Sequence, residues 1–153
     1  MINVEIASEE DYQTIEDIGR KSLPIYYSRM DLFILNLSKH TILKIVENDI
    51  IVGYLVHNTL KNEKRIHIMS IGILEEFQRK KLGTKLIDYL KNSSEYQVSL
   101  YVQINNEKAI NFYKKNNFEI NKKMINYYDN LEVKDAYYMV YDPELNKNNM
   151  SSC

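Results

Sequence analysis

The sequence predicts an α/β domain in which helices flank a mixed sheet, mostly antiparallel but with one parallel pair of strands. Three apolar, β-branched segments follow one another at residues 41–46, 49–58 and 64–74, separated only by short polar loops. This order is typical of an antiparallel meander. A helix pattern and another strand pattern then follow the third segment, and a strand, helix and strand in succession indicate two parallel strands.

Composition and charge are those of one ordinary globular domain. The chain has 153 residues, 44% of them hydrophobic, which is enough to bury a core without disulfides or metal. Lys and Arg number 20 against 21 Asp and Glu, so the overall charge does not favour nucleic acid or an acidic membrane as partner. The one cysteine, Cys153, excludes an internal disulfide framework and a cysteine metal cluster.

We expect a soluble, intracellular protein, cytoplasmic and also nuclear, without a metal. The start of the chain lacks the pattern of a signal peptide, and no window approaches 18 apolar residues. A single domain is expected over residues 1–143, and residues 144–153 read as a polar, flexible tail.

The first elements are a strand over residues 3–7 and a helix that ends near Ser22. Ser8, with Asp11 three residues later, offers the N-cap of this helix, and Pro24 stops it. Residues 23–37 are apolar and aromatic without a clear period, which indicates a turn followed by a short helix.

The second half begins with a helix over residues 82–91, where leucine recurs every four residues, and a strand over Gln97–Gln103. Asn105 or Asn106 caps another helix, whose first turn contains Glu107. Two closing strands, near residues 118–128 and 133–141, flank a turn signal at Asp129 and Asn130.

A short basic segment, residues 75–83, joins the end of a strand to the start of a helix. A loop in this position can bind an anion, because a helix N-terminus lies behind it. Gly83 allows a close backbone approach, and Arg79, Lys80 and Lys81 add positive charge. A solvated basic turn is equally compatible with these residues, and the segment is neither a P-loop nor a GxGxxG motif.

Two motifs in the same chain resemble one family. Gln78-Arg79-Lys80-Lys81-Leu82-Gly83 is similar to the Q/R-x-x-G-x-G/A loop of the Gcn5-related N-acetyltransferase (GNAT) superfamily. NEKAINFYKKNNF, residues 106–118, is similar to its second signature, N-x-x-A-x-x-F-Y-x-x-x-G-F. LPIYY, KRIHIMSIG and INYYDNL resemble the catalytic subunits of NatE-type N-terminal acetyltransferases over nearly the whole chain.

Two positions depart from the family pattern. Lys81 replaces the first loop glycine, so either the backbone there keeps a conformation open to an L-residue or the pyrophosphate binds slightly differently. Asn117 replaces the glycine that ends the second helix, and asparagine is the next best residue for a left-handed C-cap.

The resemblance implies the GNAT acyl-CoA N-acyltransferase fold, in which two parallel strands splay apart and hold acetyl-CoA. Main-chain N–H groups near Ile71 and Ile73 are implied to bind the pantetheine arm and to polarise the thioester carbonyl. The residues implied to bind the cofactor are Ile71, Gly72, Ile73, Gln78, Arg79, Lys80, Lys81, Leu82, Gly83, Thr84, Asn106, Ala109, Phe112, Tyr113 and Lys115.

Three residues are candidates for catalysis. Alternation along the two parallel strands places His67 and Tyr101 where their side chains can converge. We expect His67 to be the general base through ordered water that Tyr101 orients. By resemblance, NatE-type enzymes have the two residue types exchanged at these positions. The alternative interpretation of His67 is a strand histidine that makes only a structural hydrogen bond. Tyr113 by resemblance protonates the leaving thiolate, or it belongs to the core.

The resemblance also implies a peptide groove and an activity. One wall is formed by Leu23, Pro24, Ile25 and Tyr27, the other by Tyr127 and Tyr128, and Met69 touches the first substrate residue. The implied reaction moves acetyl from acetyl-CoA to the α-amine of Met-starting polypeptides by direct attack in a ternary complex, with lysine side activity.

Two alternatives stay open. One is a weakly active or non-catalytic acetyl-CoA-binding subunit of a ribosome-associated NatA- or NatE-type complex. The other is a RimI-like GNAT enzyme for small amines or ribosomal-protein termini. The implied partners are nascent or mature protein N-termini and NatA-type auxiliary and catalytic subunits at the ribosome, with no nucleic acid and no membrane.

Overall fold

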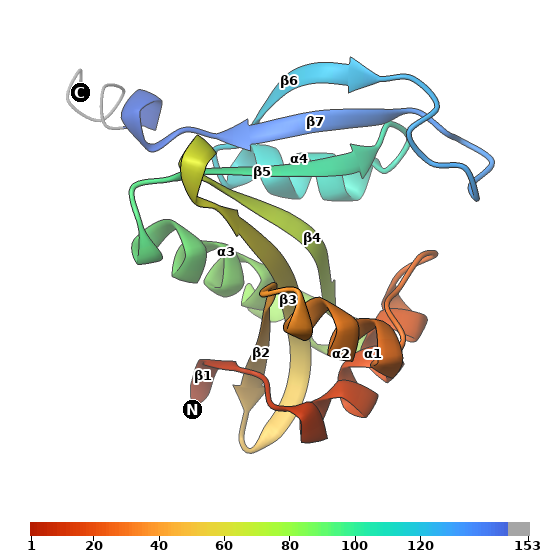
Figure 1. The fold of residues 1–153 in the computed structure, drawn as a ribbon, viewed down its shortest axis with the longest axis vertical. Coiled ribbons are helices and arrows are strands. Elements are labelled where there is room, and N and C mark those ends of the chain that lie inside the picture. Colours follow the sequence, from red (N-terminus) through yellow and green to blue (C-terminus); the bar gives the residue numbers. More distant parts are fainter. Residues whose placement is uncertain (147–153) are drawn as a thin grey trace. The chain divides into compact units, whose positions relative to one another are not determined.

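The computed structural model describes residues 1–146, without the side chain of Arg79. Its strands follow one another across the sheet in the order β1-β2-β3-β4-β5-β7-β6 (Figure 1). The strands are β1 (Ile2–Ile6), β2 (Thr41–Glu47), β3 (Ile50–Leu60), β4 (Arg65–Ile73), β5 (Gln97–Gln103), β6 (Glu119–Met124) and β7 (Ala136–Tyr141). The helices are α1 (Tyr12–Ser22), α2 (Arg29–Leu37), α3 (Leu82–Ser93) and α4 (Glu107–Lys115), with 3-10 turns η1 (Glu9–Asp11), η2 (Lys61–Glu63) and η3 (Glu75–Lys80).

The predicted mixed sheet is confirmed. Strands β4 and β5 are parallel, whereas β1 with β2, β2 with β3, β5 with β7 and β6 with β7 are antiparallel. The chain divides into two compact units, and β4 begins in one and continues in the other. Unit 1 comprises Met1–Thr59 and Ile68–Ser93, and unit 2 comprises Leu60–His67 and the chain from Ser94 onward.

Unit 1 contains the antiparallel strands β1, β2 and β3 and the helices α1, α2 and α3. Leu43 of β2 pairs with Leu55 of β3, and the two strands are joined at Asn48 and Asp49, both with left-handed φ values of 51° and 67°. Two left-handed residues make the hairpin turn whose twist matches the strands, and short polar side chains tolerate that backbone. The predicted hairpin is therefore confirmed.

Helices α1 and α2 pack on a common apolar cluster in unit 1. Its fully or nearly buried members are Tyr12, Ile15, Ile18, Leu32, Ile42, Tyr54 and Val56. Gly72 of β4 lies against this cluster, because a Cβ there would be only 2.7 Å from Cε1 of Tyr54. A side chain at position 72 would therefore displace the Tyr54 ring.

The predicted cap of the first helix is present with one difference, and the second helix is capped as well. Ser8 and Asp11 interact as expected, with the Ser8 backbone N–H 2.9 Å from Oδ2 of Asp11, but the turn they start is η1 and the α-helix begins only at Tyr12. Ser28 caps α2 by accepting the Asp31 N–H at 3.1 Å. The segment predicted as a turn plus a short helix is thus confirmed.

Unit 2 is built around β5. The start of β4 pairs with β5 through Arg65–Gln97, Ile66–Val98 and His67–Ser99, and β7 pairs along the other edge of β5. Asn106 caps α4, as predicted, by accepting the Ala109 N–H at 3.2 Å.

The two faces of the unit 2 sheet differ. Val98, Leu100 and Val102 are buried on one face, along which α4 lies (Figure 1). Asn117, after this helix, has the left-handed φ of 69° that was predicted. The other face carries Ser99 and Tyr101 from β5, because successive strand residues point to opposite sides.

The last hairpin is shorter than predicted. Strand β6 ends at Met124 instead of near residue 128, and β7 begins at Ala136 instead of residue 133. Asn126 has a left-handed φ of 56°, and its N–H donates to Oδ1 of Asp135 at 2.9 Å, so a local turn replaces strand pairing. The predicted turn at residues 129–130 lies inside the resulting loop.

The end of the described chain is a helical turn. Residues 143–146 are helical, and the Asn146 N–H donates to the Asp142 carbonyl at 3.2 Å. The remainder of the expected flexible tail, residues 147–153, lies outside the described residues, and the single domain over residues 1–143 stays a prediction. Within residues 1–146, no helix has the length and hydrophobicity needed to cross a membrane.

Candidate active site

His67 and Ser99 meet across the parallel strand pair in unit 2. The Nδ1 atom of His67 lies 2.8 Å from Oγ of Ser99, which is fully buried. Burial lowers the pKa of His67 below its ordinary value, and the positive charge of Arg65 lowers it further. The imidazole is therefore neutral at pH 7. One of its two nitrogens, Nδ1, is engaged in the hydrogen bond with the serine hydroxyl.

This hydrogen bond leaves Nε2 as the nitrogen that can take up a proton. If Nδ1 carries the hydrogen and donates it to Ser99, Nε2 has a lone pair, which is the tautomer of a general base. The reverse tautomer, with Ser99 as donor, would leave Nε2 protonated. The serine contact alone is also the structural hydrogen bond of the alternative interpretation.

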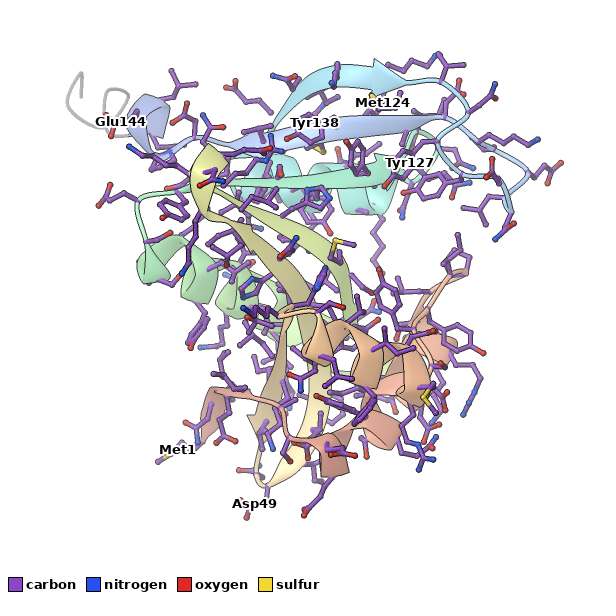
Figure 2. The ribbon with its side chains drawn as sticks, viewed as in Figure 1. Met1, Asp49, Met124, Tyr127, Tyr138 and Glu144 are labelled. Atoms are coloured by element: carbon purple, nitrogen blue, oxygen red, sulfur yellow. The ribbon has the colours of Figure 1, made fainter. Side chains whose placement is uncertain are left out.

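Tyr101 lies at the centre of an aromatic cluster. Its ring centroid is 5.3 Å from that of His67, 4.2 Å from that of Tyr127 and 5.0 Å from that of Tyr138. The Tyr127 ring is stacked on it at 21°, whereas the His67 ring meets it edge-on at 64°. Tyr138 belongs to β7 and Tyr127 to the loop after β6 (Figure 2). The predicted proximity of His67 and Tyr101 is confirmed, and the role of each stays a prediction.

Two cations lie beside this cluster. The Arg65 guanidinium carbon is 5.9 Å from the Tyr138 ring centroid, and Nζ of Lys122 is 5.5 Å from it. Arg65 also forms an ion pair with Glu63. Cations over an aromatic face are attracted by its quadrupole, so they hold the Tyr138 ring in place.

Tyr113 belongs to α4 of unit 2 and is one of its buried residues. Its ring packs edge-on against Phe112 at 5.2 Å and against Phe118 at 5.6 Å between centroids. Burial raises the pKa of Tyr113, and the charge of Tyr128 would raise it further. The hydroxyl therefore keeps its proton, which suits both a core residue and a proton donor.

In unit 1, the basic loop has the backbone conformation of a glycine-containing loop. Lys81 has φ 59° and ψ 29°, which is left-handed, and α3 starts at the next residue. Lys81 therefore has the left-handed backbone that is typical of glycine and that an L-residue adopts only rarely, and the way a pyrophosphate binds there stays a prediction. Gln78 donates from Nε2 to the Ile73 carbonyl at 3.1 Å, which ties the loop to the end of β4.

The lysine side chains of this loop are not equally available to bind an anion. Lys80 donates from Nζ to both carboxylate oxygens of Glu47, at 3.1 and 3.2 Å, whereas the Lys81 side chain is exposed. The first N–H groups of α3 have no acceptor within the helix. No acidic residue occurs between Phe77 and Ile87. This end of the helix consequently fits a diphosphate.

The predicted substrate-binding residues differ in exposure. Ile25 and Met69 in unit 1 are 45% and 39% exposed, while Leu23 and Tyr27 pack against the apolar cluster below α1 and α2. In unit 2, Tyr127 is 43% exposed.

Within unit 2, the structure brings two predicted substrate residues to the predicted catalytic pair. Tyr127 stacks on Tyr101, and the Tyr128 ring meets that of Tyr127 at 4.9 Å and 89°. Burial raises the pKa of Tyr128 to about 12, so its ring is a neutral phenol at neutral pH.

Sequence reasoning missed three residues. Ser99 could have been found, because it shares a face with Tyr101 and pairs in register with His67. No sequence pattern points to Tyr138, since its place beside Tyr101 depends on the pairing of β5 with β7. Glu47 is 33 residues from Lys80, and nothing in the sequence links them.

Comparison with known proteins gives concordant results. The Acetyltransferase (GNAT) family matches residues 6–118. N-alpha-acetyltransferase 50 of Danio rerio is 38% identical over 99 residues, which are 60% of this chain and 59% of that protein. The chain thus spans little more than half the length of this relative. An N-alpha-acetyltransferase of Saccharolobus solfataricus is 31% identical over 151 residues, which are 87% of this chain and 88% of that protein.

A solved structure shares the fold. Arabidopsis thaliana Naa50 in complex with the bisubstrate analogue CoA-Ac-MVNAL has a TM-score of 0.79 and 25% identity, and the alignment covers 92% of this chain and 98% of that one. The mixed sheet with a parallel strand pair, the basic loop before α3 and the match over residues 6–118 agree with one another. The chain therefore belongs to the acetyltransferase (GNAT) family.

Proposed function

We propose that the chain is an N-terminal protein acetyltransferase that moves acetyl from acetyl-CoA to the α-amine of polypeptides beginning with methionine. The observation that supports this most is the neutral His67, fixed by Ser99 and placed against Tyr101, in a chain similar to N-alpha-acetyltransferase 50. The analogue bound by Arabidopsis Naa50 joins CoA to the peptide MVNAL, which begins with methionine.

Acetyl-CoA supplies the thioester that the amine attacks. In unit 1, the exposed Lys81, the backbone at Leu82, Gly83 and Thr84, and Gln78 and Arg79 would hold its diphosphate, and N–H groups of Ile71, Gly72 and Ile73 would bind the pantetheine and the carbonyl oxygen. In unit 2, the cofactor contacts would be Asn106, Ala109, Phe112, Tyr113 and Lys115. The family's use of acetyl-CoA supports this assignment.

His67 would accept the proton of the substrate amine at Nε2 through a water that Tyr101 orients. A peptide α-amine has a pKa of about 7.7 to 8.0, so a neutral imidazole suffices to deprotonate it, whereas a lysine near 10.4 needs a stronger base. Transfer to lysine should therefore be a slow side activity. Direct attack requires no acyl-enzyme, and the one cysteine of the chain is Cys153.

Tyr113 would return a proton to the departing sulfur. Its raised pKa keeps the phenol protonated at neutral pH, so it can only donate. The deep packing between Phe112 and Phe118 supports a core role equally, and substitution by phenylalanine separates the two.

Substrate contacts are proposed in each unit separately. In unit 1, Met69 and the segment from Leu23 to Tyr27, with Pro24 and Ile25 between them, would contact the first residues of the peptide. In unit 2, Tyr127 and Tyr128 would flank it, since tyrosine combines apolar area with a hydroxyl for backbone groups. We place the reaction in the cytoplasm, and association with NatA-type subunits at the ribosome rests on the resemblance alone.

A weakly active or non-catalytic subunit is the second candidate. Lys81 and the exchanged His67–Tyr101 pair are the features that suggest it. The left-handed backbone at Lys81 is the conformation that a glycine would adopt there, which favours an intact loop and hence the active enzyme.

One assay tests the proposal. Initial rates with acetyl-CoA are compared for a peptide beginning Met-Leu, the same peptide with a blocked N-terminus and an internal lysine, and a free polyamine. We expect the Met-Leu peptide to be acetylated fastest. Transfer to the polyamine or the lysine peptide without transfer to the free N-terminus would replace this function with another GNAT activity.

A further inference from the structure

The ion pair between Glu47 and Lys80 lies next to the left-handed residue of the basic loop. We propose that Glu47 and Lys80 are positioning residues whose ion pair, the Glu47–Lys80 clamp, holds Lys81 in the conformation needed to bind the diphosphate of a coenzyme A thioester. Lys80 then acts through the loop and does not itself contact phosphate. This inference rests on the proposed function, because it concerns the same coenzyme loop.

The Glu47–Lys80 clamp is a close contact that involves both oxygens of the carboxylate. Both carboxylate oxygens of Glu47 accept from Nζ of Lys80, at 3.1 and 3.2 Å, and the Glu47 side chain is only 14% exposed. Nζ of Lys80 also lies 5.2 Å from the centroid of the Phe77 ring. The Lys80 side chain is 51% exposed, so the strength of the pair rests on the two contacts to the shielded Glu47 carboxylate.

Glu47 is a fixed anchor. It is the last residue of β2, and the hairpin turn that follows is held by the start of the chain: the Met1 amino group donates to Oδ1 of Asn48 at 3.1 Å, and the Asn48 N–H donates to the Met1 carbonyl. The clamp therefore ties the loop to the rigid end of a hairpin.

The left-handed backbone of Lys81 needs contacts that stabilise it. A left-handed backbone disfavours an L-residue by about tenfold or more relative to glycine. Conformations of this kind persist when the surrounding structure determines them from both sides. After Lys81, its carbonyl accepts the Lys85 N–H at 3.1 Å in the first turn of α3. Before it, the clamp acts on the immediately preceding residue.

Two other contacts of the loop among the described residues lie further from Lys81. The Ile73 carbonyl accepts from Gln78 Nε2 at 3.1 Å and from Ser22 Oγ at 3.2 Å, which fixes the start of η3. Neither contact restrains the two peptide groups around Lys81. Since Glu47 neutralises Lys80, the charge that Lys80 could offer to a phosphate is already compensated.

The test is a set of coenzyme A dissociation constants measured by titration calorimetry. The proteins are the natural chain, E47Q, K80M and E47Q/K80M, and the same four with K81G added. We expect E47Q and K80M each to weaken binding about fivefold, and the double variant no further, because each removes the same pair. With glycine at position 81, these losses should fall below twofold.

A matched control removes an ion pair elsewhere in unit 1. D17N breaks the contact between Asp17 and Arg20, 2.7 Å apart on α1, and should leave coenzyme A binding unchanged. Thermal unfolding of every variant shows whether the fold is intact.

Three results decide against the clamp. If K80M weakens binding while E47Q strengthens it, Lys80 is a phosphate ligand with which Glu47 competes. If both variants lower the melting temperature but bind coenzyme A normally, the pair only stabilises the fold. Losses that are undiminished in the K81G background would show that the pair does not act through Lys81. Failure of the natural chain to bind coenzyme A would instead overturn the proposed function.

Discussion

His57 of β3 in unit 1 and His67 of β4 in unit 2 are both largely buried, yet their surroundings differ. Burial lowers the pKa of each, to about 4 for His57 with the charge of His40 adding to the effect. His67 makes a hydrogen bond to Ser99 through Nδ1. Neither Nδ1 of His57 nor Nδ1 of His40 has a hydrogen-bond partner among residues 1–146.

The difference separates a histidine suited to chemistry from one that affects stability. The hydrogen bond to Ser99 fixes the orientation of the His67 ring, and in the tautomer in which Nδ1 is the donor the other nitrogen can serve as a base. Nδ1 of His57 has no such partner among residues 1–146, and the neutral form of His57 is the form that folding requires. Burial and a lowered pKa alone therefore do not identify a catalytic histidine.

The largest expected effect is on turnover when His67 is removed. H67F keeps an aromatic ring against Tyr101 but has no nitrogen, and general base catalysis contributes about 10²- to 10⁴-fold. We expect kcat for a Met-Leu peptide to fall at least about 100-fold, with acetyl-CoA binding nearly unchanged. Steady-state kinetics and calorimetry measure the two quantities.

H57L is the matched control, since it removes the other buried histidine. Its kcat at pH 7.5 should equal that of the natural chain. Normal turnover in H67F, or an equal loss in H57L, would show that the two histidines do not differ in their role in catalysis.

The next effect is on the pH dependence of stability. His57 has a pKa of about 4 in the folded chain and about 6.5 when unfolded, so between these values the unfolded state binds more protons. The free energy of unfolding is therefore highest above pH 6.5 and falls as the pH drops towards 4. The difference of about 2.5 pKa units corresponds to roughly 3 kcal/mol.

Urea denaturation between pH 4 and 7.5 measures this slope, and comparison with H57L isolates the contribution of His57. Leucine should flatten the curve while leaving the stability at pH 7.5 nearly the same, because an apolar group replaces an unpaired polar one. Parallel curves for the two proteins would show that His57 is solvated or paired in solution.

A smaller effect is expected from the hydroxyl of Ser99. S99A removes the hydroxyl that contacts Nδ1 of His67, so the ring loses the hydrogen bond that orients it. A neutral hydrogen bond contributes about 1 kcal/mol, and we expect kcat to fall about tenfold or less while the peptide KM changes little.

S99C is the control for filled space, because its thiol is larger than a hydroxyl and occupies the site but is a weak hydrogen-bonding group. It should lose nearly as much activity as S99A. Full activity in S99C with loss in S99A would mean that Ser99 fills space and does not orient the imidazole.

Much of the fold follows from local rules. Alternating apolar residues predict the strands, and short polar side chains predict the turn at Asn48 and the left-handed Asn117, since each depends only on neighbours in the chain. The length of β6 did not follow, because a single hydrogen bond from the Asn126 N–H to Asp135, nine residues away, ends the strand.

The site was predictable to the extent that it lies on strands. Alternation and register place His67 near Tyr101, whereas the stacking of Tyr127 depends on the path of a loop. Local patterns also gave no distinction between His57 and His67. That distinction is made by Ser99 and by the absence of a comparable partner for His57 among the described residues.

The smallest expected effect concerns the charge beside His67. Burial is the main cause of the lowered pKa of His67, and Arg65 adds to it, so R65M should raise the pKa only part of the way to its ordinary value. A raised pKa means that the imidazole loses its proton at higher pH, and the acid limb of the kcat profile should therefore move to higher pH. K122M removes the other cation on the Tyr138 ring without touching the charge next to His67, and its profile should stay in place. An acid limb that moves equally in both variants would assign the shift to packing of the Tyr138 ring, and a limb that moves to lower pH in R65M would exclude His67 as the group that titrates.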